Sequence, residues 1–257
     1  MLDELMYRLP DSAFVTAWVA TVGLVVGSYL NVVVYRLPAG LSTVRPGSRC
    51  PRCLSPIRPF DNIPVLSFLL LAGRCRRCRM RISWRYPAVE AVTSVLFVSV
   101  FRLFPGRPLV AVAGALLCCT WLVLGLIDWD LRLVPLPVIV PALVLLLVAQ
   151  PWLAWVSWLD AWLGSMVGAV ALATVGELWR LRTGDPGFAA GDLWGIALVG
   201  AAWGWQGAVV VFAVAAALGV LAAAWMRLGG DSRDSLPFVS FLALAGLGIH
   251  VLWPAWT

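Results

Sequence analysis

Long apolar runs without a charged residue alternate with short polar segments along most of the chain. About 20 apolar residues are enough to cross the hydrocarbon core of a bilayer, so each run predicts a transmembrane helix. The uncharged stretch 193–226 is too long for one crossing, and Gly204-Trp205-Gln206-Gly207 predicts a turn that divides it in two. The predicted spans are 12–35, 86–101, 109–127, 133–149, 161–176, two within 193–226, and 236–249.

Composition supports this pattern. Hydrophobic residues make up 61% of the chain and charged residues 12%, with a mean hydropathy of +0.91. An ordinary soluble domain has about a quarter charged residues, so that class is excluded. The sequence predicts an all-α polytopic membrane protein with about eight transmembrane helices, in contact with membrane lipid.

One long polar segment, Arg36 to Arg85, interrupts the pattern and contains eleven arginines against a single acid, Asp61. Short loops rich in Arg stay on the cytoplasmic side of a membrane, which makes this loop cytoplasmic and, with eight spans, puts both termini outside. Sixteen of the nineteen arginines then lie inside. The net charge of +6 follows from this orientation, so we expect no nucleic-acid partner.

Four cysteines of the loop form two Cys-x-x-Cys pairs, Cys50 with Cys53 and Cys75 with Cys78. Four thiolates at this spacing suit one tetrahedral zinc ion, which would order a loop that lacks a helical period. The alternative is that the pairs are surface turns without metal. The predicted domains are an N-terminal transmembrane helix (1–35), a zinc-stapled cytoplasmic loop (36–86) and a multi-helix domain (87–257). Cys118 and Cys119 lie in an uncharged run and are expected to be small buried hydrophobes.

Two carboxylates reach the same membrane face from different predicted spans, Asp128 at the end of the third and Asp192 at the start of the sixth. An acid at a helix C-terminus opposes the macrodipole, which singles out Asp128. Asp192 has an alternative role as an ordinary N-cap. Asp130 and Asp185 compete for the same functions, and Glu90, near the start of the second span, is either functional or a cap.

If Asp128 and Asp192 meet, they can share one proton, so that one acts as a base toward water while the other polarises a carbonyl. This is the chemistry of an aspartic protease at a membrane surface.

Several motifs resemble the type IV prepilin peptidase family, the bifunctional leader peptidase and N-methyltransferase of pilus and type II secretion systems. The resemblance covers nearly the whole chain. It rests on the two cysteine pairs and on three segments, Gly27-Ser28-Tyr29-Leu30-Asn31-Val32-Val33-Val34-Tyr35-Arg36-Leu37-Pro38, Asp61-Asn62-Ile63-Pro64-Val65-Leu66-Ser67 and Arg85-Tyr86-Pro87-Ala88-Val89-Glu90.

The resemblance implies two catalytic aspartates. The first stands seven residues before a proline in the family, which selects Asp128 before Pro135, and the second closes a Gly-x-Gly-Asp motif, which selects Asp192. The sequence departs from the family pattern at three positions: Ala189 replaces the first Gly of that motif, Leu136 replaces an Asp, and Trp194 replaces a Lys.

The resemblance also implies a substrate, a cofactor and a location. The substrate would be a prepilin or pseudopilin with a short basic leader, cleaved at the cytoplasmic face of the bacterial inner membrane. Methylation of the new N-terminus would use S-adenosylmethionine, although the sequence contains no Gly-rich nucleotide loop that supports this activity independently. The main alternatives are a polytopic transporter and an assembly scaffold with a zinc-stabilised loop. A transporter would place ionisable groups nearer mid-membrane and often shows internal repeats, which we do not detect.

Overall fold

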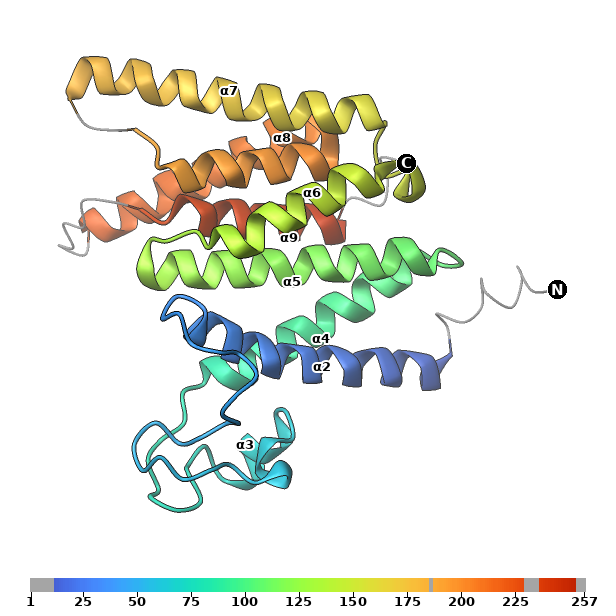
Figure 1. The fold of residues 1–257 in the computed structure, drawn as a ribbon, viewed down its shortest axis with the longest axis vertical. Helices are drawn as coiled ribbons and strands as arrows, with labels where there is room; N and C mark the ends of the chain where they lie inside the picture. Colours follow the sequence, from blue (N-terminus) through green and yellow to red (C-terminus); the bar gives the residue numbers. More distant parts are fainter. Residues whose placement is uncertain (1–11, 185–186, 229–235, 253–257) are drawn as a thin grey trace. The chain divides into compact units, whose positions relative to one another are not determined.

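The computed structural model describes residues 12–184, 187–228 and 236–252, and helices form almost all of its regular structure (Figure 1). Within these residues there is no β-strand, only two isolated bridges. Predictions for residues 1–11, Asp185 and Arg233 lie outside the described residues. The chain divides into two compact units, residues 1–119 and 120–257.

In the first unit, two long helices pack together, α2 (Ala13–Arg36) and α4 (Arg85–Leu103). Glycine permits their close approach, because a Cβ on Gly27 would lie 2.7 Å from the Glu90 Cα. Small residues at such contacts are typical of helix pairs in membranes. Asn31 of α2 strengthens the contact by donating a hydrogen bond of 3.2 Å to the Tyr86 carbonyl of α4.

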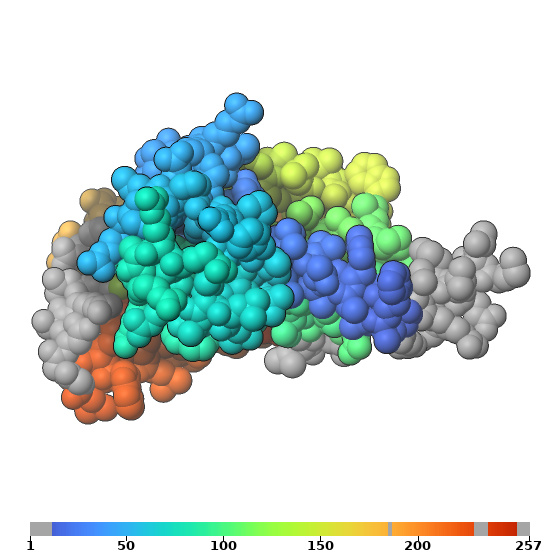
Figure 2. Space-filling view, turned by 90° about the horizontal axis from the view of Figure 1, so that it is seen from below, coloured from blue at the N-terminus to red at the C-terminus, as the bar shows by residue number. Residues whose placement is uncertain are grey.

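The polar loop between these helices contains two short helices that the sequence analysis missed, η2 (Pro59–Asn62) and α3 (Leu66–Leu70). Helices of four and five residues are too short to show an apolar period, which explains the omission. The rings of Phe68 and Trp84 pack at 4.6 Å, so a small apolar contact also helps to order the loop. Figure 2 shows the loop residues gathered into one continuous surface next to α2.

The second unit contains the end of α5 (Pro108–Leu131), then α6 (Leu136–Leu153), α7 (Trp158–Thr183), α8 (Ala190–Leu228) and α9 (Phe238–Leu252). Figure 1 shows α8 between α7 and α9, and α8 packs against both of them and against α6. Gly164 brings α7 against α8, because a Cβ there would lie 2.5 Å from the Gly204 carbonyl carbon. Gln150 of α6 donates a buried hydrogen bond of 2.7 Å to the Ala201 carbonyl.

The predicted break within 193–226 is confirmed at Gly204, whose φ of 67° and ψ of −171° are not helical. This backbone conformation is essentially restricted to glycine. Both ends of α8 lie near the C-terminal end of α5. Asp192, at the start of α8, interacts electrostatically with Asp128 of α5. Trp225, near the end of α8, lines a cavity together with Trp129 of α5. The chain therefore folds back at Gly204 and forms two antiparallel arms.

The first arm of α8 is the centre of the second unit. Nearly every residue from Asp192 to Ala202 is buried, and residues such as Leu198 and Val199 have no exposed surface. A helix that is apolar on all sides is surrounded by other elements, in agreement with its packing on α6, α7 and α9. Asp192, at the N-terminus of this arm, is therefore also buried among these helices.

Six helices of the described chain are long and apolar enough to cross a membrane, namely α2, α4, α5, α6, α7 and α8. With α8 counted as two arms and the shorter apolar helix α9 added, the number agrees with the predicted eight and confirms an all-α multi-pass membrane protein. Some helix ends differ from the prediction. α5 continues to Leu131, about one turn beyond Ile127, and α6 begins only after Pro135.

Candidate functional site

Asp128 lies in the last turn of α5, where Leu124 and Ile127 are fully buried and the Asp128 residue itself is only 6% exposed. The helix ends at Leu131, three residues after Asp128. Arg132 adopts a positive φ of 56°, and its N–H donates a hydrogen bond of 2.9 Å to the Asp128 carbonyl. A left-handed residue at this position is a usual helix stop. The side chain of Asp128 is thereby held at the end of the helix.

Ser240, in the first turn of α9, supplies the hydrogen-bond partners of Asp128. The Ser240 N–H donates to Asp128 Oδ2 at 2.8 Å, and the Ser240 hydroxyl lies 2.9 Å from the same oxygen. A helix N-terminus stabilises negative charge. This arrangement offsets the unfavourable position of an acid at the C-terminus of α5. The sequence analysis missed Ser240, although a polar residue in the first turn of an apolar helix was a signal that could have found it.

Asp192 lies in the first turn of α8 and is 9% exposed. Its Oδ2 accepts a hydrogen bond of 2.8 Å from the N–H of Ala189, the residue before the helix. An acid at the third helical position that reaches back to the N-cap N–H forms half of a capping box. Asp192 is therefore not the N-cap itself, and its side chain satisfies a backbone donor at the start of α8.

Gly191 explains how the start of α8 can lie beside the segment that follows α5. A Cβ at this position would collide with the side chain of Val134, so only glycine fits without a shift. Ala189 does not have a positive φ, and alanine therefore adds no backbone strain there. The other two departures from the family pattern, Leu136 and Trp194, are 51% and 38% exposed.

The two buried aspartates come together at one end of the second unit. The negative charges of the two carboxylates repel each other, and the positive charge of Arg132 attracts the Asp128 carboxylate. Two carboxylates that are close and shielded from water favour a state in which they share a proton. Asp130, only two residues from Asp128, lies on an exposed part of α5. Asp185 lies outside the described residues. The geometry thus brings together the pair that the sequence analysis selected, and it can support acid–base chemistry.

The four loop cysteines also converge, with all four sulfur atoms within 4.8 Å of one another. Cys50 Sγ lies 3.7 Å from Cys78 Sγ. Zinc–sulfur bonds of about 2.3 Å in a tetrahedron separate the sulfur atoms by about 3.8 Å, so the observed spacing fits zinc. Hydrogen bonds from the Ser55 hydroxyl and backbone lower the pKa of the Cys53 thiol to about 6, which favours the thiolate that a metal binds. Cys118 is buried and belongs to no such cluster.

The two cysteine pairs have the same local backbone. Leu54 N–H donates to the Cys50 carbonyl and Arg79 N–H donates to the Cys75 carbonyl, at 2.9 and 3.0 Å. Leu54 and Arg79 have similar positive φ values of 54° and 59°. Each pair is therefore a tight knuckle that points two sulfur atoms at the same place.

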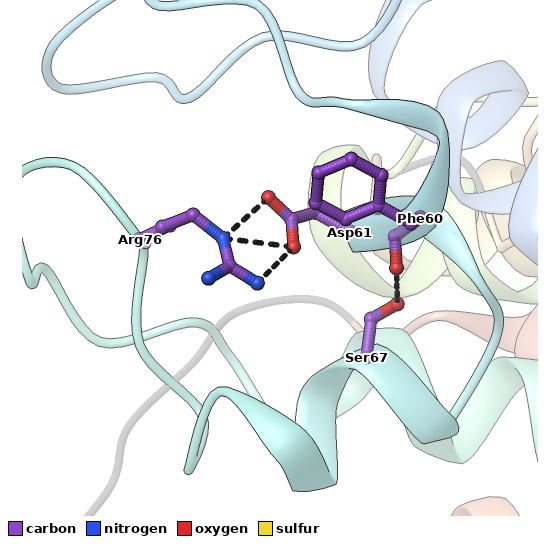
Figure 3. Close-up of polar contacts among 4 residues, drawn as sticks. All are labelled: Phe60, Asp61, Ser67 and Arg76. Carbon is purple, nitrogen blue, oxygen red and sulfur yellow. Dashed lines mark hydrogen bonds and ion pairs between the residues drawn. The ribbon is translucent and has the colours of Figure 1, made fainter.

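Asp61 connects the second knuckle to η2, as Figure 3 shows. Its carboxylate accepts three hydrogen bonds of 2.7 to 3.0 Å from the Arg76 guanidinium. The Arg76 guanidinium holds the pKa of Asp61 below its usual range. Ser67, at the start of α3, donates a hydrogen bond of 3.0 Å to the Phe60 carbonyl in the same close-up. The single acid of the loop thus has a structural partner.

Glu90 also has a structural role. It is 7% exposed, and its Oε2 accepts a hydrogen bond of 2.7 Å from the N–H of Val65. Val65 has a positive φ of 59°, which is unusual for a β-branched residue. Ser28 of α2 forms a further hydrogen bond with Glu90. Glu90 therefore joins α2, α4 and the strained turn before α3.

Two known protein families match the sequence of this chain. The Bacterial Peptidase A24 N-terminal domain matches residues 21–104, and the Type IV leader peptidase family matches residues 115–224. The chain belongs to the type IV leader peptidase family. The first match contains the cysteine knuckles, and the second contains both Asp128 and Asp192.

Curated relatives of this leader peptidase family carry the name prepilin leader peptidase/N-methyltransferase. The protein from Pseudomonas putida is 38% identical, over 95% of this chain and 92% of its own length. The protein from Pseudomonas aeruginosa is 37% identical over 90% and 88% of the two lengths, and the one from Aeromonas hydrophila is 34% identical over 98% and 95%. No solved structure matches the chain.

Proposed function

We propose that this protein is a membrane-embedded aspartic endopeptidase that cleaves the leader of type IV prepilins and related pseudopilins, with Asp128 and Asp192 as the catalytic residues. The observation that carries the proposal is the meeting of these two buried carboxylates at one end of the second unit. Membership of the leader peptidase family agrees with it. The family disfavours the transporter and scaffold alternatives.

In the proposed reaction, one aspartate is ionised and the other is protonated. The ionised carboxylate takes a proton from water, and the resulting hydroxide attacks the scissile carbonyl while the protonated aspartate donates to its oxygen. When the tetrahedral intermediate collapses, the C–N bond breaks and the departing amine takes up a proton from the aspartates. The products are a leader with a free carboxylate and a mature chain with a new N-terminal amine.

A cavity of about 320 Å³, lined in part by Trp129, the residue after Asp128, supports an apolar substrate. Its lining is mainly apolar, with Arg132 as the charged member; the lining residues are Trp129, Arg132, Ala222, Trp225, Met226, Leu236, Pro237 and Phe241. An apolar helix that follows the cleavage site could lie here. Prepilins have such a helix directly after their basic leader, according to the family resemblance.

Substitution of each aspartate by asparagine tests the proposal, because Asn keeps the side-chain volume and removes the ionisable group. We expect leader cleavage by the purified full-length protein to fall by about 10³-fold or more in Asp128→Asn and in Asp192→Asn. Asp130→Asn and Asp185→Asn are matched controls that should keep most activity. Cleavage that persists in Asp192→Asn and disappears in Asp185→Asn would overturn the assignment of the second aspartate.

The names of the relatives support a second activity, N-methylation of the new N-terminus. S-adenosylmethionine would supply the methyl group for this step. The four cysteines would hold one structural zinc ion and thereby organise the domain at 36–86, between the N-terminal helix at 1–35 and the peptidase domain at 87–257.

The proposed location is the bacterial inner membrane, with the arginine-rich loop and both aspartates on the cytoplasmic side and both termini outside. The distribution of arginine supports this orientation. Reporter fusions after Trp84 and Arg182 should report cytoplasm, and fusions at Pro105 and Thr257 should report outside. The reverse pattern would place the aspartates on the wrong side for a cytoplasmic leader.

A further inference from the structure

The hydroxyl of Ser240 lies between two acceptors. It is 2.9 Å from Asp128 Oδ2 and 2.9 Å from the Gly125 carbonyl oxygen. A hydroxyl has one hydrogen and can donate to only one of them at a time. The backbone N–H of Ser240, 2.8 Å from Asp128 Oδ2, has no such choice and always donates to the carboxylate.

The charge of Asp128 decides between the two positions of the hydroxyl hydrogen. When Asp128 is ionised, the hydrogen turns to Oδ2, because lone pairs on both oxygens would otherwise face each other at 2.9 Å. Both Ser240 donors then occupy Oδ2, and Oδ1 is the oxygen that Ser240 leaves for the exchange of protons. When Asp128 is neutral, the hydrogen can turn to the Gly125 carbonyl without movement of any heavy atom.

The surroundings of the two aspartates are unequal. Asp128 has the Ser240 hydroxyl and N–H at the N-terminus of α9, a hydrogen bond from the backbone of Val239, and the charge of Arg132 nearby. Among the described residues Asp192 accepts a hydrogen bond from one donor, the N–H of Ala189, and it lies close enough to Asp128 for the two charges to interact. Donors that bind the charged form favour ionisation, so Asp128 is better stabilised as the carboxylate.

We infer that Ser240 is a positioning residue that holds Asp128 as the ionised base, with Oδ1 as its reacting oxygen, and so leaves the shared proton on Asp192. This inference rests on the proposed peptidase function and adds a division of roles within it. Asp128 Oδ1 takes the proton of the attacking water, and Asp192 donates its proton to the scissile carbonyl oxygen. In this division of roles Ser240 acts through Asp128, to which both of its donors are bound.

The test measures leader cleavage by the purified full-length enzyme in detergent as a function of pH, with a prepilin as substrate. Ser240→Ala removes the hydroxyl and keeps the backbone donor. We expect kcat to fall by about tenfold to a hundredfold, since hydrogen bonds to charged groups are worth about that factor. The acid limb of the kcat/KM profile should move by about one pH unit to higher pH, because the charged base loses a donor.

Two further substitutions separate positioning from packing. Ser240→Thr keeps the hydroxyl and should restore the position of the acid limb, whereas Ser240→Cys, a weaker donor of similar size, should give an intermediate position. Ser165→Ala is the matched control, because Ser165 lies in the same unit and is buried to a similar degree, at 6% exposure against 4% for Ser240. Its pH profile should equal that of the unmodified protein.

Three outcomes would overturn the inference: unchanged kinetics in Ser240→Ala, a loss of activity with an unmoved acid limb, or a Thr variant that behaves like Ala. Should Ser240→Ala fail to fold, the Cys and Thr profiles still decide. The proposed function is judged separately. If Asp128→Asn and Asp192→Asn are both inactive while the Ser240 variants behave normally, only the division of roles is wrong; if either Asn variant cleaves normally, the proposed catalytic pair itself fails.

Discussion

In the polar loop of the first unit, the carboxylate of Asp61 is paired with a guanidinium, whereas Asp128 and Asp192 of the second unit form no ion pair among the described residues. Asp61 binds Arg76 through three hydrogen bonds. Asp128 and Asp192 form no ion pair within the part of the chain that the structure describes, and their partners there are backbone N–H groups and one hydroxyl. Both regions join segments distant in sequence, but with different chemistry.

This difference separates structural from reactive acids. A carboxylate that is bound by a guanidinium stays ionised over the whole physiological range and serves as a fixed connection. Two buried carboxylates that are not held in an ion pair keep the ability to exchange a proton, which acid–base catalysis requires. We therefore expect the loop to serve as a structural scaffold and the aspartate end of the second unit to be the place of chemistry.

The largest effect should come from combining Asp128→Asn with Asp192→Asn. Each single substitution is expected to reduce cleavage by about 10³-fold or more, and the double variant should be scarcely worse, because both groups act on one transition state. The measurement is single-turnover cleavage of a prepilin. Zinc content should stay unchanged in all three variants, since the cysteines belong to the other unit. Losses that multiplied would mean that the aspartates act independently.

Removal of the metal ligands should affect the loop and spare the bundle. Cys50→Ser combined with Cys75→Ser should abolish the binding of about one zinc per chain, measured by metal analysis of the purified protein. The loop should then be cut more rapidly by trypsin at its arginines. The helices of the bundle should remain inserted, because their backbone hydrogen bonds are internal.

Cys119→Ser is the control for this experiment, as Cys119 lies outside the cluster and should leave the zinc content unchanged. Absence of metal from the intact protein would contradict the zinc assignment. The knuckles would then be turns held by their backbone hydrogen bonds alone.

Much of the fold could be predicted, because a helix that crosses a bilayer needs about 20 consecutive apolar residues, and such runs can be recognised in the sequence. Charge-free runs identify helices, and the glycines near Trp205 identify the reversal within α8. Exact helix ends could not be predicted. The end of α5 depends on the left-handed conformation of Arg132, and composition around that residue does not reveal it.

The candidate site could be predicted only in part. The motifs select Asp128 and Asp192, and the alternation of spans places them on one face. Ser240 could not be paired with Asp128 in this way, because 112 residues separate them and the contact depends on the packing of α9 against α5. Glu90 was an ambiguous candidate for the same reason, since its partner Val65 lies in a loop without a period.

Glu90→Ala should have a smaller effect, confined to the first unit. It removes the acceptor of the Val65 N–H, and loss of a hydrogen bond to a charged group costs about 1.5–3 kcal/mol. Residues around α3 should exchange amide hydrogen faster by a corresponding factor, measured by hydrogen–deuterium exchange. Glu90→Gln keeps one acceptor oxygen and should have a weaker effect. An equal effect of both variants would show that the charge, and not the acceptor, anchors the loop.

The smallest effect concerns the pair of Asp61 and Arg76 and its dependence on pH. Because Arg76 lowers the pKa of Asp61 in the folded loop, the pair stabilises the loop fully above the unfolded value of about 4, and this contribution is lost as the pH falls through the folded pKa. Asp61→Asn removes the ionised partner. Hydrogen exchange of η2, corrected for intrinsic rates, should therefore differ between the variant and the unmodified protein at pH 7, and the difference should shrink in strong acid.

Glu177→Gln, which changes an exposed acid of α7 paired with Arg180, should leave exchange in η2 unchanged at both pH values. If the exchange difference between Asp61→Asn and the unmodified protein instead stayed constant down to strong acid, Asp61 would act by its shape and not by its charge. The contrast between a loop fixed by an ion pair and an aspartate pair that exchanges a proton would then no longer hold.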